Sequence, residues 1–228
     1  MERRVAIEVA DVGLVSGALS LPESEPDLAP RRTGIVLAHG AGGNMDLPLL
    51  AHFARDLAAA GHPVLRFNFP YSEKGRKAPD RPPVLAAAWE AAYRAFSMES
   101  GVDSIVAAGK SMGGRIASEL AAAGRLPVAG LVFLGYPLHP PGRSERVRDE
   151  HLYRIQVPML FFAGTRDSLC NLELLKGVLD RIEAPTRLEV VEGGDHSFNV
   201  PHSAGISTVE INARLASRTV SWLSGIRT

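Results

Sequence analysis

The sequence predicts an α/β protein, built as a three-layer α/β/α sandwich around a mostly parallel sheet. After Arg32, short runs rich in Val, Ile, Leu and Phe alternate with longer segments of helical pattern. Almost continuous apolar runs are typical of parallel strands that are buried on both faces. Regular alternation of strand and helix favours βαβ units with right-handed crossovers. We therefore expect helices on both faces of the sheet.

The N-terminal residues follow a different pattern, which predicts an antiparallel hairpin at one edge of the sheet. Apolar residues alternate over 5–9, a turn is expected at 11–13, and a second strand is expected over 14–19. The next segment, 22–32, is rich in Pro, Glu and Asp and predicts a loop. The parallel part of the sheet is expected only after this loop.

The rest of the chain supplies strands and helices in alternation. Strands are predicted at 34–38, 63–69, 104–108, 128–134, 157–163 and 187–191, and helices at 48–60, 83–100, 112–123, 172–182 and 205–223. Glycine follows three of these helices, where it can adopt the left-handed conformation that ends a helix. Ligands of parallel sheets bind beyond the carboxyl ends of the strands, so the residues that follow each strand are the candidates for chemistry.

Length and composition fit one globular domain that spans residues 1–228. The 25 basic and 25 acidic residues give zero net charge, so neither nucleic acid nor an acidic membrane surface is an expected partner. The one cysteine, Cys170, can form no disulfide within the chain and no cysteine-based metal site. We expect neither a membrane span nor a signal peptide, because no apolar run is long enough. These features together predict a cytoplasmic protein.

One segment has the pattern of an activated serine. Residues 109–114 read Gly-Lys-Ser-Met-Gly-Gly and match G-x-S-x-G, with a predicted strand before them and a predicted helix after them. Glycine on both sides of Ser111 would permit the sharp turn that exposes a nucleophile. Gly-Lys-Ser also ends a phosphate-binding P-loop, but that motif needs glycine where Ser104 stands. We therefore predict Ser111 as a nucleophile and reject nucleoside triphosphate binding.

A general base and an acid follow two later strands. His196 lies in a glycine-rich loop after the last predicted strand, and Asp167 follows the strand predicted at 157–163. An imidazole base needs a carboxylate on its second nitrogen, which fixes the tautomer and stabilises the imidazolium. Asp195 adjoins His196 and is the alternative acid. Since adjacent residues rarely face each other in the required geometry, Asp167 is preferred and Asp195 is expected to shape the loop.

A tetrahedral intermediate needs two hydrogen-bond donors for its oxyanion. The backbone N–H of Met112, directly after the predicted nucleophile, is the expected first donor. The second is expected from the glycine-rich loop after the strand 34–38, with the N–H of Ala41 preferred and that of Gly42 in reserve. His39 is expected to anchor this loop rather than to take part in the reaction.

These motifs, taken in order, carry a resemblance. Together with the segments 66–71 and 135–141, the motifs around 39–43, 109–114, 164–167 and 194–198 resemble the α/β-hydrolase family that includes the testis-expressed protein 30. More distantly, the chain is similar to dienelactone hydrolases, although those use a cysteine nucleophile. The resemblance runs from about residue 33 to the C-terminus. It implies the α/β-hydrolase fold and a triad in the order Ser111, Asp167, His196.

The expected substrate is a small carboxylic ester or thioester, cleaved through an acyl-enzyme, with no metal and no organic cofactor. Gly42, Tyr71, Lys110 and Tyr136 are candidate substrate contacts. The segment 135–156 is short for a helical cap, which favours an open site. Basic residues gather in two loops, Lys74, Arg76, Lys77 and Arg81 in one and Arg143, Arg146, Arg148 and Arg154 in the other. Solvated charge is the favoured interpretation of these loops, and an anionic substrate is the alternative.

A second class of function stays open on the sequence alone. Since a fold does not determine a function, the chain would also suit a non-catalytic scaffold or binding protein that keeps the hydrolase fold without the chemistry. The two hypotheses differ in one geometric expectation. A hydrolase needs the hydroxyl of Ser111 close to His196, whereas a scaffold does not. The sequence leaves the oligomeric state open.

Overall fold

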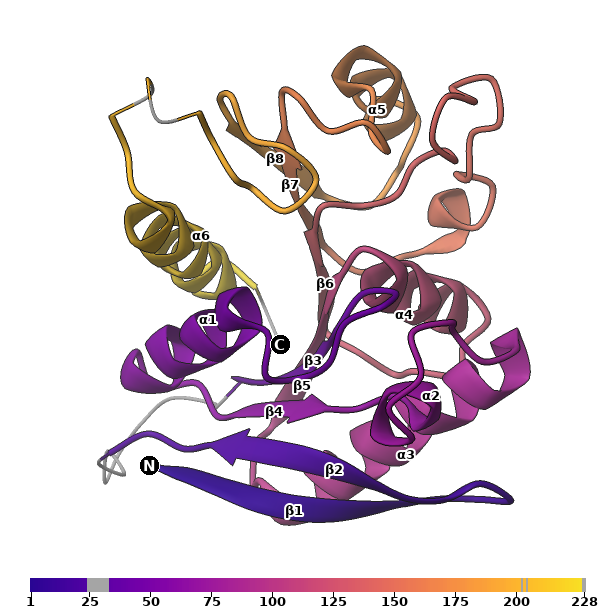
Figure 1. The fold of residues 1–228 in the computed structure, drawn as a ribbon, viewed down its shortest axis with the longest axis vertical. Coiled ribbons are helices and arrows are strands. Elements are labelled where there is room, and N and C mark those ends of the chain that lie inside the picture. Colours follow the sequence, from indigo (N-terminus) through magenta and orange to yellow (C-terminus); the bar gives the residue numbers. More distant parts are fainter. Residues whose placement is uncertain (24–32, 202, 204, 227–228) are drawn as a thin grey trace.

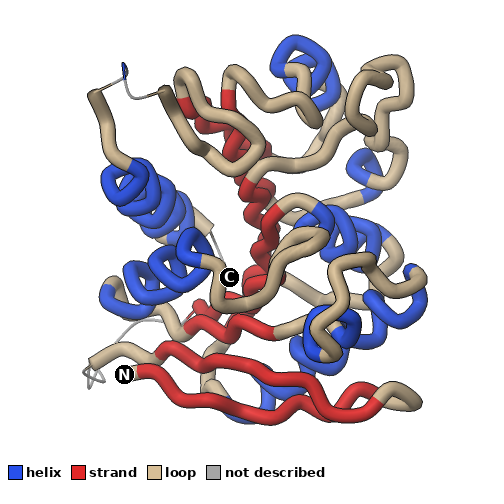
Figure 2. Tube along the Cα trace, in the orientation of Figure 1, coloured by secondary structure: helices blue, strands red, loops and turns tan. Residues whose placement is uncertain are grey.

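The structure, a computed structural model, describes residues 1–23, 33–201, 203 and 205–226. Most of the loop predicted at 22–32 lies outside the described residues. Figure 1 shows the ribbon, and Figure 2 shows the strands running through the middle of the molecule with helices on both sides. The predicted fold class, a three-layer α/β/α sandwich with an N-terminal antiparallel hairpin, is confirmed.

The described strands form one eight-stranded sheet in the order β1-β2-β4-β3-β5-β6-β7-β8. β1 pairs with β2 and β2 with β4 in antiparallel fashion, and every later pair is parallel. The apolar strands β3 to β7 are buried along nearly their whole length, as expected for a sheet covered on both faces. Their bounds are β1 Glu2–Val9, β2 Gly13–Ser20, β3 Thr33–Ala38, β4 Val64–Phe67, β5 Ser104–Lys110, β6 Gly130–Leu134, β7 Met159–Gly164 and β8 Thr186–Val191.

Two helices cover one face of the sheet, and three cover the other (Figure 1). α1 (Pro48–Ala59) and α6 (Thr208–Leu223) pack together on the first face. α3 (Pro82–Glu99), α4 (Met112–Ala122) and α5 (Leu172–Leu179) lie on the second. A short helix α2 (Pro70–Glu73) follows β4, and a 3₁₀ turn η1 spans Leu152–Arg154.

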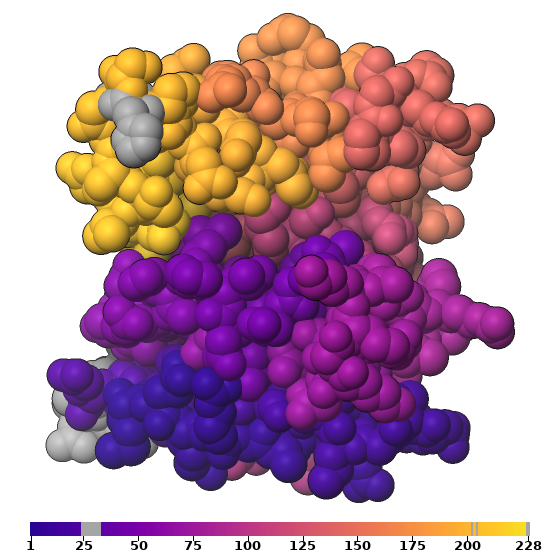
Figure 3. Space-filling view, in the orientation of Figure 1, coloured from indigo at the N-terminus to yellow at the C-terminus, as the bar shows by residue number. Residues whose placement is uncertain are grey.

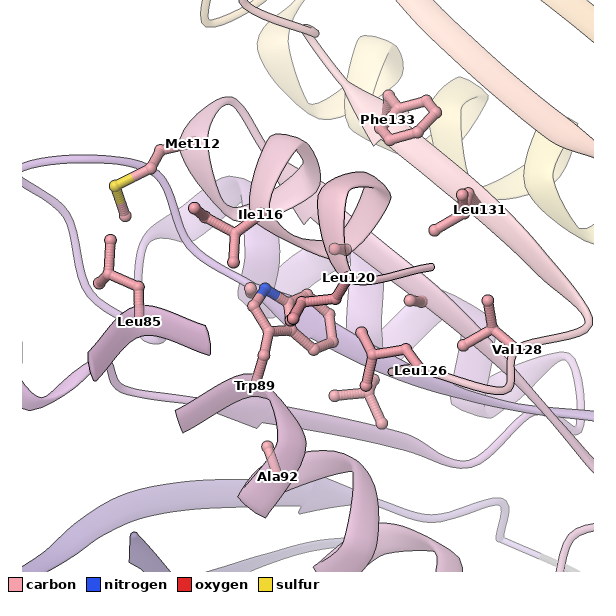
Figure 4. Close-up of a cluster of buried hydrophobic side chains, with 14 of the residues drawn as sticks. Leu85, Trp89, Ala92, Met112, Ile116, Leu120, Leu126, Val128, Leu131 and Phe133 are labelled. Atoms are coloured by element: carbon pink, nitrogen blue, oxygen red, sulfur yellow. The ribbon is translucent and has the colours of Figure 1, made fainter. Parts of the chain in front are cut away.

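The largest part of the core lies between α3, α4 and the sheet. Figure 4 shows Trp89 of α3 beneath α4, surrounded by Leu85, Ile116 and Leu120. The buried Trp89 ring also donates a hydrogen bond from Nε1 to the carbonyl oxygen of Gly113, at 3.0 Å. Because Gly113 belongs to the first turn of α4, this contact fixes the helix end at which Ser111 lies.

The boundaries differ from the prediction in two informative places. The strand predicted at 63–69 ends at Phe67, and α2 begins at Pro70, whose fixed φ suits the first turn of a helix. The helix predicted from residue 205 begins at Thr208, because Ser207 and Glu210 form a reciprocal capping box.

Among the described residues, no helix is both long enough and apolar enough to cross a membrane. The cytoplasmic location stays a prediction.

Candidate active site

Ser111 lies on the sharp turn between β5 and α4. Its backbone has φ 51° and ψ −119°, a conformation that is strained for a residue with a Cβ. The turn closes only because its glycines lack side chains: a Cβ on Gly109 would lie 2.2 Å from the backbone nitrogen of Gly114. A Cβ on Gly113 would lie 2.5 Å from the carbonyl oxygen of His39. The turn therefore presents the Ser111 side chain at the carboxyl edge of the sheet.

The structure brings Ser111, His196 and Asp167 together in one hydrogen-bonded chain. The Ser111 hydroxyl donates to Nε2 of His196 at 2.8 Å, and Nδ1–H of the same ring donates to Oδ2 of Asp167 at 2.8 Å. The Asp167 side chain is fully buried, whereas the His196 side chain is 21% exposed. The three residues follow β5, β7 and β8, so the parallel sheet gathers them at one edge (Figure 1).

The two candidate acids have different surroundings. Asp167 turns one carboxylate oxygen to His196 and accepts the backbone N–H of Leu169 with the other, at 2.8 Å. Asp195 accepts the backbone N–H groups of Ser197 and Asn199 at 2.7 and 2.9 Å. Burial alone would raise the pKa of Asp195, but these hydrogen bonds outweigh it and lower the pKa below its usual value. Asp195 thus holds the shape of its own loop.

The loop after β3, residues 39–44, passes directly against Ser111. A Cβ on Gly40 would lie 3.3 Å from the Cβ of Ser111, so glycine permits this close approach. The backbone N–H groups of Ala41 and Met112 donate to no other group in the described part of the chain. Neither predicted oxyanion donor is therefore occupied by another hydrogen bond among the described residues. Their catalytic role stays a prediction.

Buried side chains hold this loop in place. His39 Nε2 accepts the backbone N–H of Phe69 at 3.0 Å, which places the ring proton on Nδ1, and Nδ1–H donates to the Gly40 carbonyl at 2.8 Å. Burial lowers the pKa of His39 to about 4, so the ring is neutral at pH 7. The hydroxyl groups of Tyr71 and Ser72 donate to the carbonyls of Gly40 and Gly43, each at 3.0 Å. His39 therefore anchors the 39–44 loop, as predicted.

Three of the four predicted substrate contacts bind other parts of the chain in the structure. Tyr71 is fully buried under the 39–44 loop. Tyr136 is 1% exposed and donates to the Arg148 carbonyl at 2.9 Å. Lys110 donates to the His196 carbonyl at 2.7 Å, and Gly42 is exposed on the loop. Substrate contact by these residues stays a prediction.

Sequence reasoning missed a partly buried polar cluster between α4 and the segment around η1. His151 Nε2 lies 2.8 Å from the Ser118 hydroxyl and 3.2 Å from that of Tyr136. Burial raises the pKa of Tyr136 and lowers that of His151, so both are neutral at pH 7. Ser118 is fully buried on α4, and His151 directly precedes η1. This second Ser–His pair therefore joins α4 to the segment around η1. The partners are 33 residues apart, and no local motif indicates the contact.

The site is open to solvent. Between residues 135 and 156, η1 is the one helical turn, and residues 141–146 are exposed. Figure 3 shows a furrow across this face, between the purple segments of the N-terminal half and the yellow and orange segments of the C-terminal half. No helical cap therefore closes over Ser111 in the described part of the chain.

Comparison with known proteins agrees with this geometry. A model of the α/β hydrolase domain family matches residues 31–224. The structure is similar to XC6422 of Xanthomonas campestris, described as a serine hydrolase without a lid, with 22% identity, a TM-score of 0.73 and coverage of 97% of this chain and 94% of that one. Dienelactone hydrolase of Anabaena variabilis aligns with 21% identity and a TM-score of 0.74, covering 100% of this chain and 99% of that one.

A third similar structure is Est1E of Butyrivibrio proteoclasticus, with 14% identity and a TM-score of 0.74 over 97% of this chain and 99% of that one. At such identities the likeness shows the α/β-hydrolase fold, which confirms that part of the prediction. The finer link to the testis-expressed protein 30 stays a prediction.

Proposed function

This chain belongs to the α/β-hydrolase domain family, and on that premise we propose that it is a serine hydrolase of small carboxylic esters or thioesters. One observation carries the proposal: two hydrogen bonds of 2.8 Å link the Ser111 hydroxyl through His196 to the buried Asp167 carboxylate. A strained turn holds the hydroxyl where a substrate can reach it. We propose further that residues 1–228 act as one hydrolase domain.

The proposed reaction has two halves. In the first, Ser111 Oγ attacks the substrate carbonyl carbon while His196 Nε2 takes the hydroxyl proton. The backbone N–H groups of Ala41 and Met112 stabilise the oxyanion. The C–O or C–S bond to the leaving group breaks, and His196 returns the proton to the departing alcohol or thiol. In the second half, water gives a proton to His196 and attacks the acyl-serine, which releases the acid and restores the Ser111 hydroxyl.

The buried carboxylate accounts for the role of His196. Asp167 accepts Nδ1–H, so the unprotonated Nε2 faces Ser111 and can act as base. When His196 gains a proton, the full negative charge of Asp167 stabilises the imidazolium inside the site. The open furrow and the lack of a helical cap favour a small acyl group over a long chain that needs a deep tunnel.

A fluorophosphonate probe with intact-mass readout tests the proposal. We expect one adduct on the parent protein and none on Ser111→Ala, because only an activated serine reacts readily with the phosphorus centre. Ser118→Ala is the matched control, since Ser118 also contacts a histidine but is fully buried. It should leave the labelling intact. A folded parent protein without an adduct would refute the hydrolase proposal and favour the scaffold.

A further inference from the structure

Lys110, the residue before Ser111, is buried with no role in the reaction described above. It is 7% exposed, although lysine is almost never buried without a partner. Its ammonium donates to the backbone carbonyl oxygen of His196 at 2.7 Å. In the described part of the chain this is the one hydrogen bond that reaches the backbone of His196. Two adjacent residues thus hold one histidine, Ser111 at the ring and Lys110 at the carbonyl.

Gly135 leaves room for the Lys110 ammonium beside the His196 carbonyl. A Cβ on Gly135 would lie 3.0 Å from the His196 carbonyl oxygen and 3.3 Å from Lys110 Nζ. Gly135 also has φ 73°, which a side chain disfavours, so glycine both makes the turn and leaves room for the contact. The Phe198 ring, buried below the loop, lies with its centroid 6.0 Å from Nζ.

The other hydrogen bonds of the 192–201 loop do not reach the backbone of His196. The first residues of the loop are tied to the segment after β7: Gly193 N–H donates to the Thr165 hydroxyl at 2.8 Å, and the Gly194 carbonyl accepts the Arg166 N–H at 2.8 Å. Among the described residues, Asp195 and Asn199 make hydrogen bonds only within the loop. His196 itself, whose ring must stay aligned with Ser111, is held through its backbone only by Lys110 among the described residues.

We propose that Lys110 is a positioning residue: its ammonium fixes the His196 carbonyl and thereby the imidazole against the Ser111 hydroxyl. This inference rests on the proposed function. A charge-assisted hydrogen bond is about twice as strong as a neutral one, which suits a residue whose backbone makes no other hydrogen bond in the described part of the chain. A misplacement of about 1 Å in such a site costs about 10²-fold in rate. Because Lys110 binds a carbonyl of the protein itself, this role requires no anionic group on the substrate.

The charge of Lys110 is sensitive to pH. Burial lowers the pKa of Lys110 to about 8, while the carboxylates of Asp167 and Asp195 oppose the decrease. The groups around the ammonium are thus these two carboxylates, the His196 carbonyl oxygen and the Phe198 ring. The hold on His196 is expected to weaken as the pH rises through 8, when the ammonium loses its charge.

Lys110→Met tests the proposal, because it keeps the length of the side chain and removes the donor. We expect kcat and the rate of fluorophosphonate labelling to fall about 10²-fold with little change in KM, since positioning acts on the reaction and not on binding. Lys176→Met, which removes an exposed lysine on α5, is the matched control and should leave both unchanged. Propylammonium added to Lys110→Ala should restore part of the rate. A folded Lys110→Met with the labelling rate of the parent would overturn the proposal.

A second measurement does not depend on turnover. In the parent protein with labelled histidine, the NMR signal of the His196 ring should show a separate inflection near pH 8, where Lys110 titrates. His196→Gln assigns the signal among the seven histidines. A His196 ring signal at the same position in the parent protein and in folded Lys110→Met would overturn the proposal. The result is independent of catalysis, so a failure of the Lys110 proposal can be told apart from a failure of the proposed hydrolase function.

Discussion

Two loops meet at Ser111, and the chain holds them in different ways. The 39–44 loop is fixed from below by buried side chains, among them the neutral ring of His39 and the hydroxyl of Tyr71. The 192–201 loop makes hydrogen bonds both within itself and to the segment after β7, and among the described residues only Lys110 binds the backbone of His196. We infer that the first loop supplies fixed donors, whereas the second carries a ring that must exchange protons.

The largest expected effect on kcat distinguishes Asp167, which binds His196, from Asp195 of the 192–201 loop. Asp167→Asn should lower kcat about 10⁴-fold, because the amide favours the wrong tautomer of His196. Asp195→Asn should cost about tenfold or less, since it weakens only hydrogen bonds that shape the loop. Ester hydrolysis rates for both variants provide the test. If Asp195→Asn proved the more damaging of the two, the assignment of Asp167 as the acid would be wrong.

On the 39–44 side, removal of one backbone donor should have the next largest effect. Ala41→Pro lacks the N–H and should lower kcat about 10²–10³-fold, the usual cost of one oxyanion donor. Ala41→Ser keeps the N–H and serves as the control for a change at this exposed position. Equal kcat values for the two variants would show that the second donor lies elsewhere, with Gly42 as the next candidate.

Acid should loosen the 39–44 loop through His39. The pKa of His39 is about 4 in the folded protein, because of burial, against an ordinary value of 6.5. Protons therefore bind the unfolded chain more readily, so this contribution is complete above pH 6.5 and is lost as the pH falls towards 4. The free energy of unfolding should decrease by about 3 kcal/mol over this window. Urea denaturation at a series of pH values measures the slope, which His39→Asn should flatten.

The smallest effect tests the contact between α4 and the 39–44 loop. A Cβ on Gly113 meets the His39 carbonyl oxygen, so Gly113→Ala should destabilise the protein by about 1–3 kcal/mol through overpacking. Gly177→Ala on α5 is the matched control, because no atom lies within 4 Å of its added Cβ. It should stabilise the helix by about 0.5–1 kcal/mol. Denaturation midpoints that moved in the same direction would contradict this account of the turn.

The parts of the site that depend on local sequence were predictable. The glycines around Ser111 indicate the turn, and the apolar run before it places that turn at the end of a strand. Asp167 and His196 follow from the rule that parallel strands end at one edge, although no motif joins them. The capping box of Ser207 and Glu210 is also a local sequence pattern. It marks the start of α6, which the prediction placed too early.

Contacts between distant segments could not be predicted. The Lys110 ammonium meets the His196 carbonyl across 86 residues, and its partner is a backbone atom that every residue has. The four-residue helix α2 is too short to produce a recognisable period. The burial of Tyr71 and Tyr136 depends on which loops fold over them, so their sequence positions indicate nearness to the site but not the direction of the side chain.

Pre-steady-state hydrolysis of p-nitrophenyl acetate tests the central claim most directly. The proposed reaction predicts a burst of p-nitrophenol close to one equivalent of protein, with the acetyl group recovered on the peptide that contains Ser111 after acid quench. The burst should be absent from Ser111→Ala. Release that is linear from the start, with no acetyl group on Ser111 and an equal rate in Ser111→Ala, would contradict an acyl-enzyme at this serine.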